Sequence, residues 1–322
     1  MRQSLHVIAC FGCFFLGCQP LDRSLKLAHG LGVEHPIHRS MEFLAERVAE
    51  KSNGSFTLEI YPSQQLGTER ECLELLQIGS LGMTKVSSSV LENFAPTLQV
   101  LGLPYLFRDR SHAYATFDGA VGRELLLAVE PVRLRGLAFL DAGQRSFYTI
   151  DRPVRTPDDL ENLKIRVQES PVAMQMVDRL GGAPTPISYG ELYTALQQGI
   201  VDGAENNPPS FYTSRHYEIA KYYSLNEHTA VPDVLLIGTA AWERLTEREQ
   251  TWLTEAVAEA TTYQRELWRA AETEALAAVE AAGVEIIRPD KSSFRERTAA
   301  LLDEFAAAPE LREVIGRIQA VE

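Results

Sequence analysis

The segment from Thr246 to Ala282 constrains the fold more than any other, because it contains neither proline nor glycine. It opens with Thr246-x-x-Glu249, a capping box that is typical of a helix start. A single helix over about 37 residues would be about 55 Å long, which is longer than one domain needs. Two helices with an unmarked break between them are the other interpretation. If the segment is one helix, it is long enough to brace two lobes.

The rest of the chain alternates strand-like and helix-like patterns, as layered α/β proteins do. Strands are predicted at 56–60 and 163–167, and helices begin at Pro36 and after Thr68. The chain has 322 residues, of which 45% are hydrophobic, so it can build more than one core. No internal repeat or long linker divides it. We therefore expect two α/β lobes, with the chain crossing between them more than once.

Charge and motifs exclude several classes of function. The formal net charge of −13 argues against nucleic-acid binding, which requires a basic stripe that neutralises phosphates. The sequence has no dinucleotide fingerprint, phosphate-binding loop, nucleophile elbow or His-Glu-x-x-His motif. His29, His35 and His38 cluster, but no Asp, Glu or Cys stands at a recognised ligand spacing around them. No metal or cofactor is therefore predicted.

The first eighteen residues resemble a bacterial secretory signal of the lipoprotein type. Arg2 precedes an apolar stretch at 5–17, and Cys18 would become the lipidated N-terminus of the mature chain. An uncleaved membrane anchor is the alternative, although about 13 apolar residues fall short of the about 20 that span a bilayer. Either interpretation predicts export of the rest of the chain. Without the leader, Cys72 is the only cysteine, so no intrachain disulfide is expected.

Arg166 is the first candidate for a binding residue, because it stands inside an apolar strand between Ile165 and Val167. A buried guanidinium must meet an acceptor or remain an uncompensated charge. A ligand carboxylate would supply the bidentate partner that arginine geometry prefers. The structural alternative is an ion pair with Glu169 or Asp202, and residue type alone favours that alternative.

Other polar residues stand at predicted element ends. Arg145 precedes a strand, and Asn206 and Asn207 follow an expected tight turn at Asp202-Gly203. Their donors and acceptors suit a carboxylate or sugar hydroxyls. An ordinary surface position explains Arg145 better, and a capping or turn role explains the two asparagines at least as well. Glu69 begins a predicted helix and could simply complement the helix dipole.

Together with the leader, four motifs resemble the substrate-binding proteins of tripartite ATP-independent periplasmic (TRAP) transporters, a family of dicarboxylate-binder-like proteins. The similarity extends from about Leu25 to Glu249. The motifs are YPSQQLG at 61–67, LKIRV at 163–167, GGAPTP at 181–186 and VDGAEN at 201–206.

The resemblance implies a two-lobed periplasmic binding protein-like α/β fold, with crossing strands and a long helix that braces both lobes. The lobes would close over an organic acid by a hinge motion. After a signal peptide at 1–18, lobe I is expected to comprise residues 24–143 plus 232–271. Lobe II is expected to comprise residues 144–231 plus 272–322.

The resemblance also implies roles for individual residues. In the family, the arginine of the Lys-Ile-Arg-Val strand pairs with the ligand carboxylate, and here that residue is Arg166. Arg145 would assist it, and Tyr189 would form an aromatic wall. The residues expected to read hydroxyls or to line the same site are Asn206, Asn207, Glu69, His35, Ser88 and Glu169.

The ligand class follows from finer motifs. Sialic-acid-binding members carry a glutamate near the position of Ser87 or Ser88, so the serines here argue against sialic acid. The remaining motifs look like those of the branch that takes sugar acids, including uronates such as glucuronate or galacturonate. These motifs are Ala28-His-Gly30, His35-Pro36, residues 143–148, residues 206–209 and His216-Tyr217.

The leading hypothesis is a periplasmic protein that captures a sugar acid and delivers it to TRAP membrane permease subunits. A binder of C4-dicarboxylates or other carboxylates from the same family is the first alternative. An exported enzyme acting on uronates is the alternative of another class, with Tyr189 or His35 as base and Arg166 stabilising an enolate. A ligand-sensing module would use the same cleft.

Overall fold

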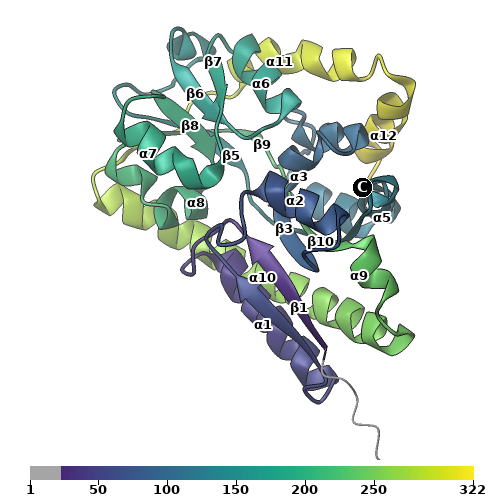
Figure 1. The fold of residues 1–322 in the computed structure, drawn as a ribbon. Coiled ribbons are helices and arrows are strands. Elements are labelled where there is room, and N and C mark those ends of the chain that lie inside the picture. Colours follow the sequence, from purple (N-terminus) through teal and green to yellow (C-terminus); the bar gives the residue numbers. More distant parts are fainter. Residues whose placement is uncertain (1–22) are drawn as a thin grey trace, which may run out of the picture.

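The computed structural model describes residues 23–322, which form two α/β lobes built on two separate sheets (Figure 1). This is the predicted fold class. The expected signal peptide at 1–18 and the expected lipidation at Cys18 lie outside the described residues. Among residues 23–322, no helix is both long and apolar enough to cross a bilayer.

Lobe I contains a five-stranded sheet in the order β2-β1-β3-β10-β4. β1, β2 and β3 are parallel, whereas β10 runs antiparallel to β3 and β4. The strands are β1 Arg23–His29, β2 Phe56–Tyr61, β3 Met83–Ser87, β4 Leu134–Leu140 and β10 Asp233–Gly238. The helices are α1 Pro36–Lys51, α2 Glu69–Gln77, α3 Ser88–Leu91, η1 Pro96–Gly102, α4 Arg110–Asp118, α5 Ala120–Leu127, η2 Glu130–Val132 and α9 Thr239–Glu243.

Lobe II contains a six-stranded sheet in the order β11-β9-β5-β8-β6-β7. β6 is parallel to both β7 and β8, and β5 is antiparallel to β8 and β9. The strands are β5 Arg145–Thr149, β6 Lys164–Val167, β7 Ala183–Pro186, β8 Gly203–Asn206, β9 Tyr222–Thr229 and β11 Glu285–Ile287. The helices are η3 Pro157–Leu160, α6 Pro171–Arg179, η4 Tyr189–Glu191, α7 Leu192–Gln197, α8 Pro208–Thr213, η5 His216–Glu218 and α11 Ser292–Phe305.

The tight turn expected at Asp202-Gly203 is wrong, because Gly203 is the first residue of strand β8. The Asp202 carbonyl oxygen already accepts a ladder-like hydrogen bond from the Ile150 N–H at 3.0 Å. A Cβ at Gly203 would collide with the Tyr148 carbonyl oxygen of β5. The glycine therefore permits close approach of two strands rather than a reversal of the chain.

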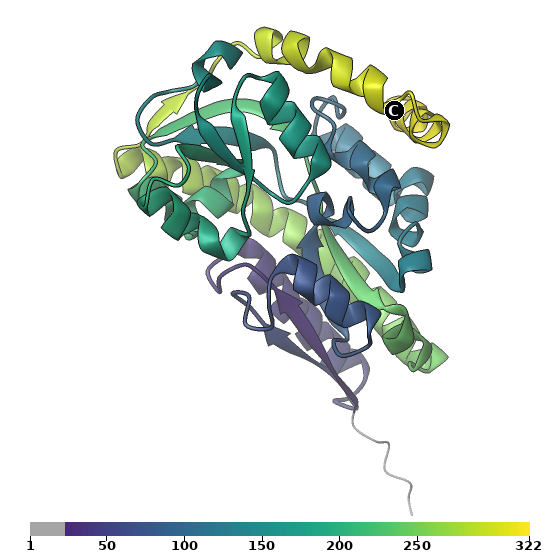
Figure 2. The same ribbon diagram turned by 45° about the horizontal axis from the view of Figure 1, so that its top comes forward.

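Helix α10 runs unbroken from Glu247 to Ala281, so the single-helix interpretation of this segment is confirmed. Its predicted capping box is formed: the Thr246 N–H donates to Glu249 Oε2 at 2.7 Å, and the Glu249 N–H donates to Thr246 Oγ1 at 3.3 Å. The helix packs against α1 and β4 of lobe I and against α8 of lobe II. In Figure 2 it runs diagonally across the molecule from lobe II to lobe I, and it braces both lobes as expected.

The chain passes between the lobes through residues 141–144, 230–232 and α10. It returns once more near its end, where α11 packs against α6 of lobe II but α12 (Pro309–Gln319) packs against η1 and α5 of lobe I. The apolar face of α12 joins the core of lobe I, and the Ile318 carbonyl oxygen lies 2.8 Å from His112 Nε2. Residues of α12 therefore lie on lobe I, whereas the expected range of lobe II, 272–322, includes them. The remaining lobe boundaries, at 143/144, 231/232 and 271/272, stay predictions.

Gly143 in the first crossing segment offers a test of how tightly the lobes are joined to α10. Its φ of +61° is unfavourable for other residues, and a Cβ there would lie 2.8 Å from Trp268 Nε1 of α10. Gly199 has a similar φ of +67° but open space around it. We expect Gly199→Ala to lower the free energy of unfolding by about 1–2 kcal/mol. Gly143→Ala should lower it by about 1–3 kcal/mol more in urea titrations, because it adds a steric clash. Equal losses in the two variants would show that the crossing segment is not packed tightly against α10.

Candidate functional site

A cleft of about 670 Å³, its mouth included, lies between the lobes. Its lining comes from the carboxyl ends of β1, β3, β6, β7 and β8 and from α10, which is where open α/β sheets bind ligands. The polar and aromatic lining residues of lobe I are His35, Gln64, Thr68, Glu69, Arg70, Lys85, Ser87 and Asp233. Those of lobe II and α10 are Arg145, Arg166, Gln168, Glu169, Ser188, Tyr189, Asn206, Asn207, Ser210 and Trp268.

Arg166 lines this cleft from β6 with only 1% of its surface exposed. Its Nε donates to the Ile187 carbonyl oxygen at 2.8 Å, but its Nη1 has no hydrogen-bond partner within the described part of the chain. Burial lowers the pKa of Arg166, which reflects the cost of an uncompensated cation. The guanidinium is therefore positioned to receive an anion.

The ion pairs considered as alternatives for Arg166 are not formed. Glu169 Oε2 lies 3.9 Å from Arg70 Nη1 instead, at the exposed rim of the cleft. Asp202 Oδ2 accepts a hydrogen bond from the Lys164 N–H at 2.7 Å. The structural explanation of Arg166, which residue type alone favoured, is thus not supported by the geometry.

The imidazole of His216, close to Arg166, adds no positive charge. His216 lies within hydrogen-bond distance of Tyr148, with 2.8 Å between Nδ1 and the hydroxyl oxygen. Burial, and then the nearby Arg166, lower the pKa of His216 to about 3, so this imidazole is neutral at pH 7. Tyr189 also lines the cleft, and its hydroxyl donates to the Ser210 carbonyl oxygen at 3.3 Å.

Arg145 is also buried in the cleft wall, but most of its donors are already engaged by β8. Its Nη2 donates to both Oε1 and the carbonyl oxygen of Glu205 at 2.8 Å, and its Nε donates to Glu205 Oε2. Burial raises the pKa of Glu205, but Arg145 and His228 outweigh that effect and lower it to about 2. Arg145 and Glu205 thus form a buried, mutually neutralising ion pair.

Sequence reasoning missed Glu205 because 203–206 was not recognised as a strand. The antiparallel register places Glu205 opposite Phe147 and Asn206 opposite Ser146, next to Arg145. An acidic residue between Ala204 and Asn206 was the available signal, but only the strand pairing gives it a partner.

The side chains of the two asparagines are held in place by hydrogen bonds to their amide oxygens. Asn206 Oδ1 accepts from Arg145 Nη1 at 3.0 Å and from the Asn207 N–H at 2.9 Å. Asn207 Oδ1 accepts from the Ser210 N–H at 2.8 Å and caps α8. Asn207 therefore has the capping role that was weighed against ligand binding, although it also lines the cleft.

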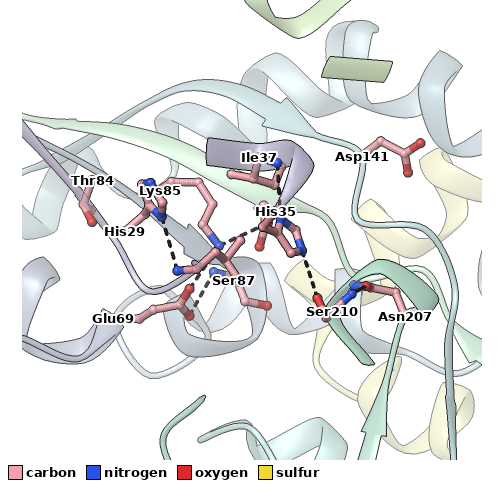
Figure 3. Close-up of polar contacts among 12 residues, drawn as sticks. His29, His35, Ile37, Glu69, Thr84, Lys85, Ser87, Asp141, Asn207 and Ser210 are labelled. Carbon is pink, nitrogen blue, oxygen red and sulfur yellow. Dashed lines mark hydrogen bonds and ion pairs between the residues drawn. The ribbon is translucent and has the colours of Figure 1, made fainter. Parts of the chain in front are cut away.

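The wall contributed by lobe I contains a cluster that the sequence did not suggest, shown in Figure 3. Lys85 Nζ lies 3.2 Å from Glu69 Oε1 and 3.1 Å from Asp233 Oδ2, and only 2% of Lys85 is exposed. Glu69 Oε2 also accepts from the Ser87 N–H at 3.1 Å. Burial opposes the charged form of Lys85, but Asp233 and Glu69 together raise its pKa. One ammonium therefore lies between two carboxylates.

His35 connects the lobes across the cleft. Its Nδ1 accepts from the Ile37 N–H at 3.2 Å as the N-cap of α1, so the proton must be on Nε2. That nitrogen lies 3.2 Å from Ser210 Oγ of α8 and donates to it (Figure 3). Burial, and then Lys85, lower the pKa of His35 well below its usual value, so the ring is neutral.

Ser88 is the predicted site residue that the structure does not bring to the cleft. It is buried at the start of α3, and its N–H donates to the Pro232 carbonyl oxygen at 3.0 Å. The preceding residue, Ser87, lines the cleft instead, and its Oγ donates to Gln168 Oε1 at 3.1 Å. The chain changes from strand β3 to helix α3 between these two residues, so the two serine side chains point in different directions.

Two α/β lobes joined by crossing segments, with a buried arginine at the ends of parallel strands in the intervening cleft, define a periplasmic solute-binding protein. The model of the DctP family, bacterial extracellular solute-binding proteins of family 7, matches residues 27–308. The chain belongs to this family, which confirms the family predicted from its motifs. It is a solute-binding transport protein of the periplasm and not an enzyme.

Solved relatives share the whole fold. A TRAP solute-binding protein from Xanthobacter autotrophicus with bound β-D-galacturonate is 38% identical, with a TM-score of 0.90 over 92% of this chain and 100% of that one. A TRAP solute-binding protein from Chromohalobacter salexigens with bound D-glucuronate is 35% identical, with the same TM-score and coverage. A curated solute-binding protein from Chromohalobacter salexigens is 36% identical over 88% of this chain and 85% of its own length.

Proposed function

We propose that the protein captures a uronate, D-galacturonate or D-glucuronate, and delivers it to the membrane permease subunits of a TRAP transporter. The observation that carries the proposal is the buried guanidinium of Arg166, whose Nη1 has no partner among residues 23–322. Solved relatives with bound galacturonate and glucuronate support the choice of sugar acid.

In this proposal the ligand carboxylate pairs with Arg166 inside the cleft. Lobe closure removes water from around the pair, and the lower local dielectric strengthens the charge-assisted hydrogen bonds. Arg145 is largely occupied by Glu205, so it acts on the ligand chiefly by orienting Asn206 through Nη1.

The ligand hydroxyls would meet the remaining polar lining. Carboxylate oxygens of Glu69 accept from hydroxyls, and Asn206 offers its amide group. His35 would hold the lobes together through Ser210 while the ligand is enclosed. Tyr189 supplies an apolar face for the sugar ring. Glu169 at the rim and Asn207 at the start of α8 complete the proposed site.

Delivery to the membrane is the second part of the proposal. The family role supports TRAP permease subunits as the partner of the closed form. If the leader is processed at Cys18, a lipid on that residue would tether the protein at the membrane surface. The mass of the mature N-terminal peptide tests this tether directly.

Calorimetry with a panel of acids tests the proposed ligand. We expect D-galacturonate or D-glucuronate to bind with one ligand per protein and to be recovered unchanged, because the site has an anion anchor and hydroxyl partners. Binding of C4-dicarboxylates alone would contradict the uronate assignment. Formation of a product from either uronate would contradict the role as a binding protein.

A further inference from the structure

The charged residues of the cleft are divided unequally between its two walls. In lobe II, the charge of Arg145 is neutralised by Glu205, which leaves Arg166 as the cation of this wall that has no acidic partner among residues 23–322. In lobe I, the single ammonium of Lys85 faces both Glu69 and Asp233. One wall thus carries an excess positive charge and the other an excess negative charge.

The other ionisable groups do not change this division. Burial lowers the pKa of His35 well below its usual value and that of His29 to about 3, so both are neutral at pH 7. Arg70 and Glu169 face each other at the rim with a separation of 3.9 Å, and their side chains are 49% and 39% exposed. Solvent screens this exposed pair, whereas the buried walls are screened much less.

Sheet geometry keeps the two walls on different lobes. Lys85 in β3 is paired with Leu235 in β10, and Asp233 is paired with Ser87, so Lys85 and Asp233 lie close together on neighbouring strands. Glu69 is the first residue of α2. Arg166 belongs to β6 of the other sheet. Figure 3 shows Glu69 and Lys85 on one side of the site and Ser210 and Asn207 on the other. A ligand that spans the cleft would have one end near Arg166 and the other near the lobe I wall.

The lobe I wall is suited to hydroxyls. An ammonium has three N–H groups, and those of Lys85 are directed largely to its two carboxylate partners. Carboxylate oxygens only accept, so a sugar hydroxyl can donate to Glu69 or Asp233 at no electrostatic penalty. A second ligand carboxylate would instead be desolvated beside an excess negative charge.

We infer that the cluster of Glu69, Lys85 and Asp233 makes the site selective for acids with a single carboxylate, by accepting hydroxyls and repelling dicarboxylates of similar length. This inference rests on the proposed function and specifies what the wall opposite Arg166 selects. Discrimination by repulsion complements the attraction between Arg166 and the first carboxylate.

The test compares D-galacturonate with galactarate, an open-chain acid in which a second carboxylate replaces the C1 aldehyde group of the sugar acid. Burial raises the pKa of Asp233 to about 6, so titrations at pH 8 keep this carboxylate ionised. We expect the wild type to bind galactarate at least about 100-fold more weakly than galacturonate, as a buried like-charge contact implies. Glu69→Gln and Asp233→Asn each remove one negative charge at nearly constant size. Each should reduce that ratio at least about tenfold.

Glu74→Gln is the matched control, because Glu74 lies on the same helix α2 but is 53% exposed and outside the cleft lining. This variant should keep the wild-type ratio. Comparable wild-type affinities for the two acids would overturn the inference while leaving uronate capture intact, and an unchanged ratio in both cluster variants would also overturn it. Failure of the wild type to bind any uronate would refute the proposed function itself. If one cluster variant is unstable, the other variant still tests the charge, and a wild-type ratio near one overturns the inference without either variant.

Discussion

Replacement of Arg166 with methionine is expected to weaken uronate binding by at least about 1,000-fold, because removing one member of a buried charge pair costs several kcal/mol. The ligand carboxylate would enter a closed cleft and meet no cation in place of Arg166. Calorimetry on wild type and variant at the same pH measures the loss. Arg166→Lys is the matched control, since it keeps a positive charge but not the planar fork of donors, and it should bind with intermediate affinity.

The same variant should fold normally in the absence of ligand. Burial already lowers the pKa of Arg166, which means that the folded protein tolerates this charge at a cost. We therefore expect a melting temperature equal to or above that of the wild type. Wild-type affinity in Arg166→Met would remove the anchor role, and a failure to fold would show that Arg166 has a structural partner.

Replacement of Arg145 with methionine is expected to lower the free energy of unfolding by about 3–5 kcal/mol, the usual cost of leaving one buried charge uncompensated. Glu205, which is 2% exposed, would keep only the neighbouring His228 at 3.4 Å. Urea denaturation monitored by circular dichroism measures the difference. The double variant Arg145→Met with Glu205→Gln should recover much of the loss, because no unpaired carboxylate then remains.

The pH dependence separates this ion pair from simple packing. In the wild type the pKa of Glu205 is lowered to about 2, below its ordinary value. The stability due to the pair is therefore fully present above pH 5 and is lost only as the pH falls towards 2. In Arg145→Met, the pKa of Glu205 should rise, so the deficit relative to the wild type should be larger at pH 7 than at pH 4. A deficit that does not vary with pH would indicate lost packing alone.

The sequence was informative where the signal is local. The capping box and the absence of helix breakers predict α10, and an arginine among apolar residues identifies Arg166 before any partner is known. Both are properties of a few consecutive residues. The motif order adds the family and, through it, the two-lobed fold.

The parts that were missed depend on contacts between distant segments. Lys85 and Asp233 are separated by 148 positions and meet only because β10 inserts between β3 and β4. Glu205 contacts Arg145 because β8 pairs with β5. The sequence gives no sign of this pairing, since Gly203 at the start of β8 is typical of a turn. Strand order is set by the packing of the whole sheet, so no local pattern could indicate these partners.

The return of α12 to lobe I bears on which lobe moves when the cleft closes. β1 begins lobe I and α12 ends on it, so both described ends of the chain are carried by the same lobe. An attachment ahead of β1 would hold lobe I still, and lobe II would swing towards it during closure. Two fluorophores placed at the two described ends would both lie on lobe I, so the distance between them would hardly change on closure. A fluorophore at Ile200, which is 49% exposed on lobe II, paired with one after α12 would follow the motion.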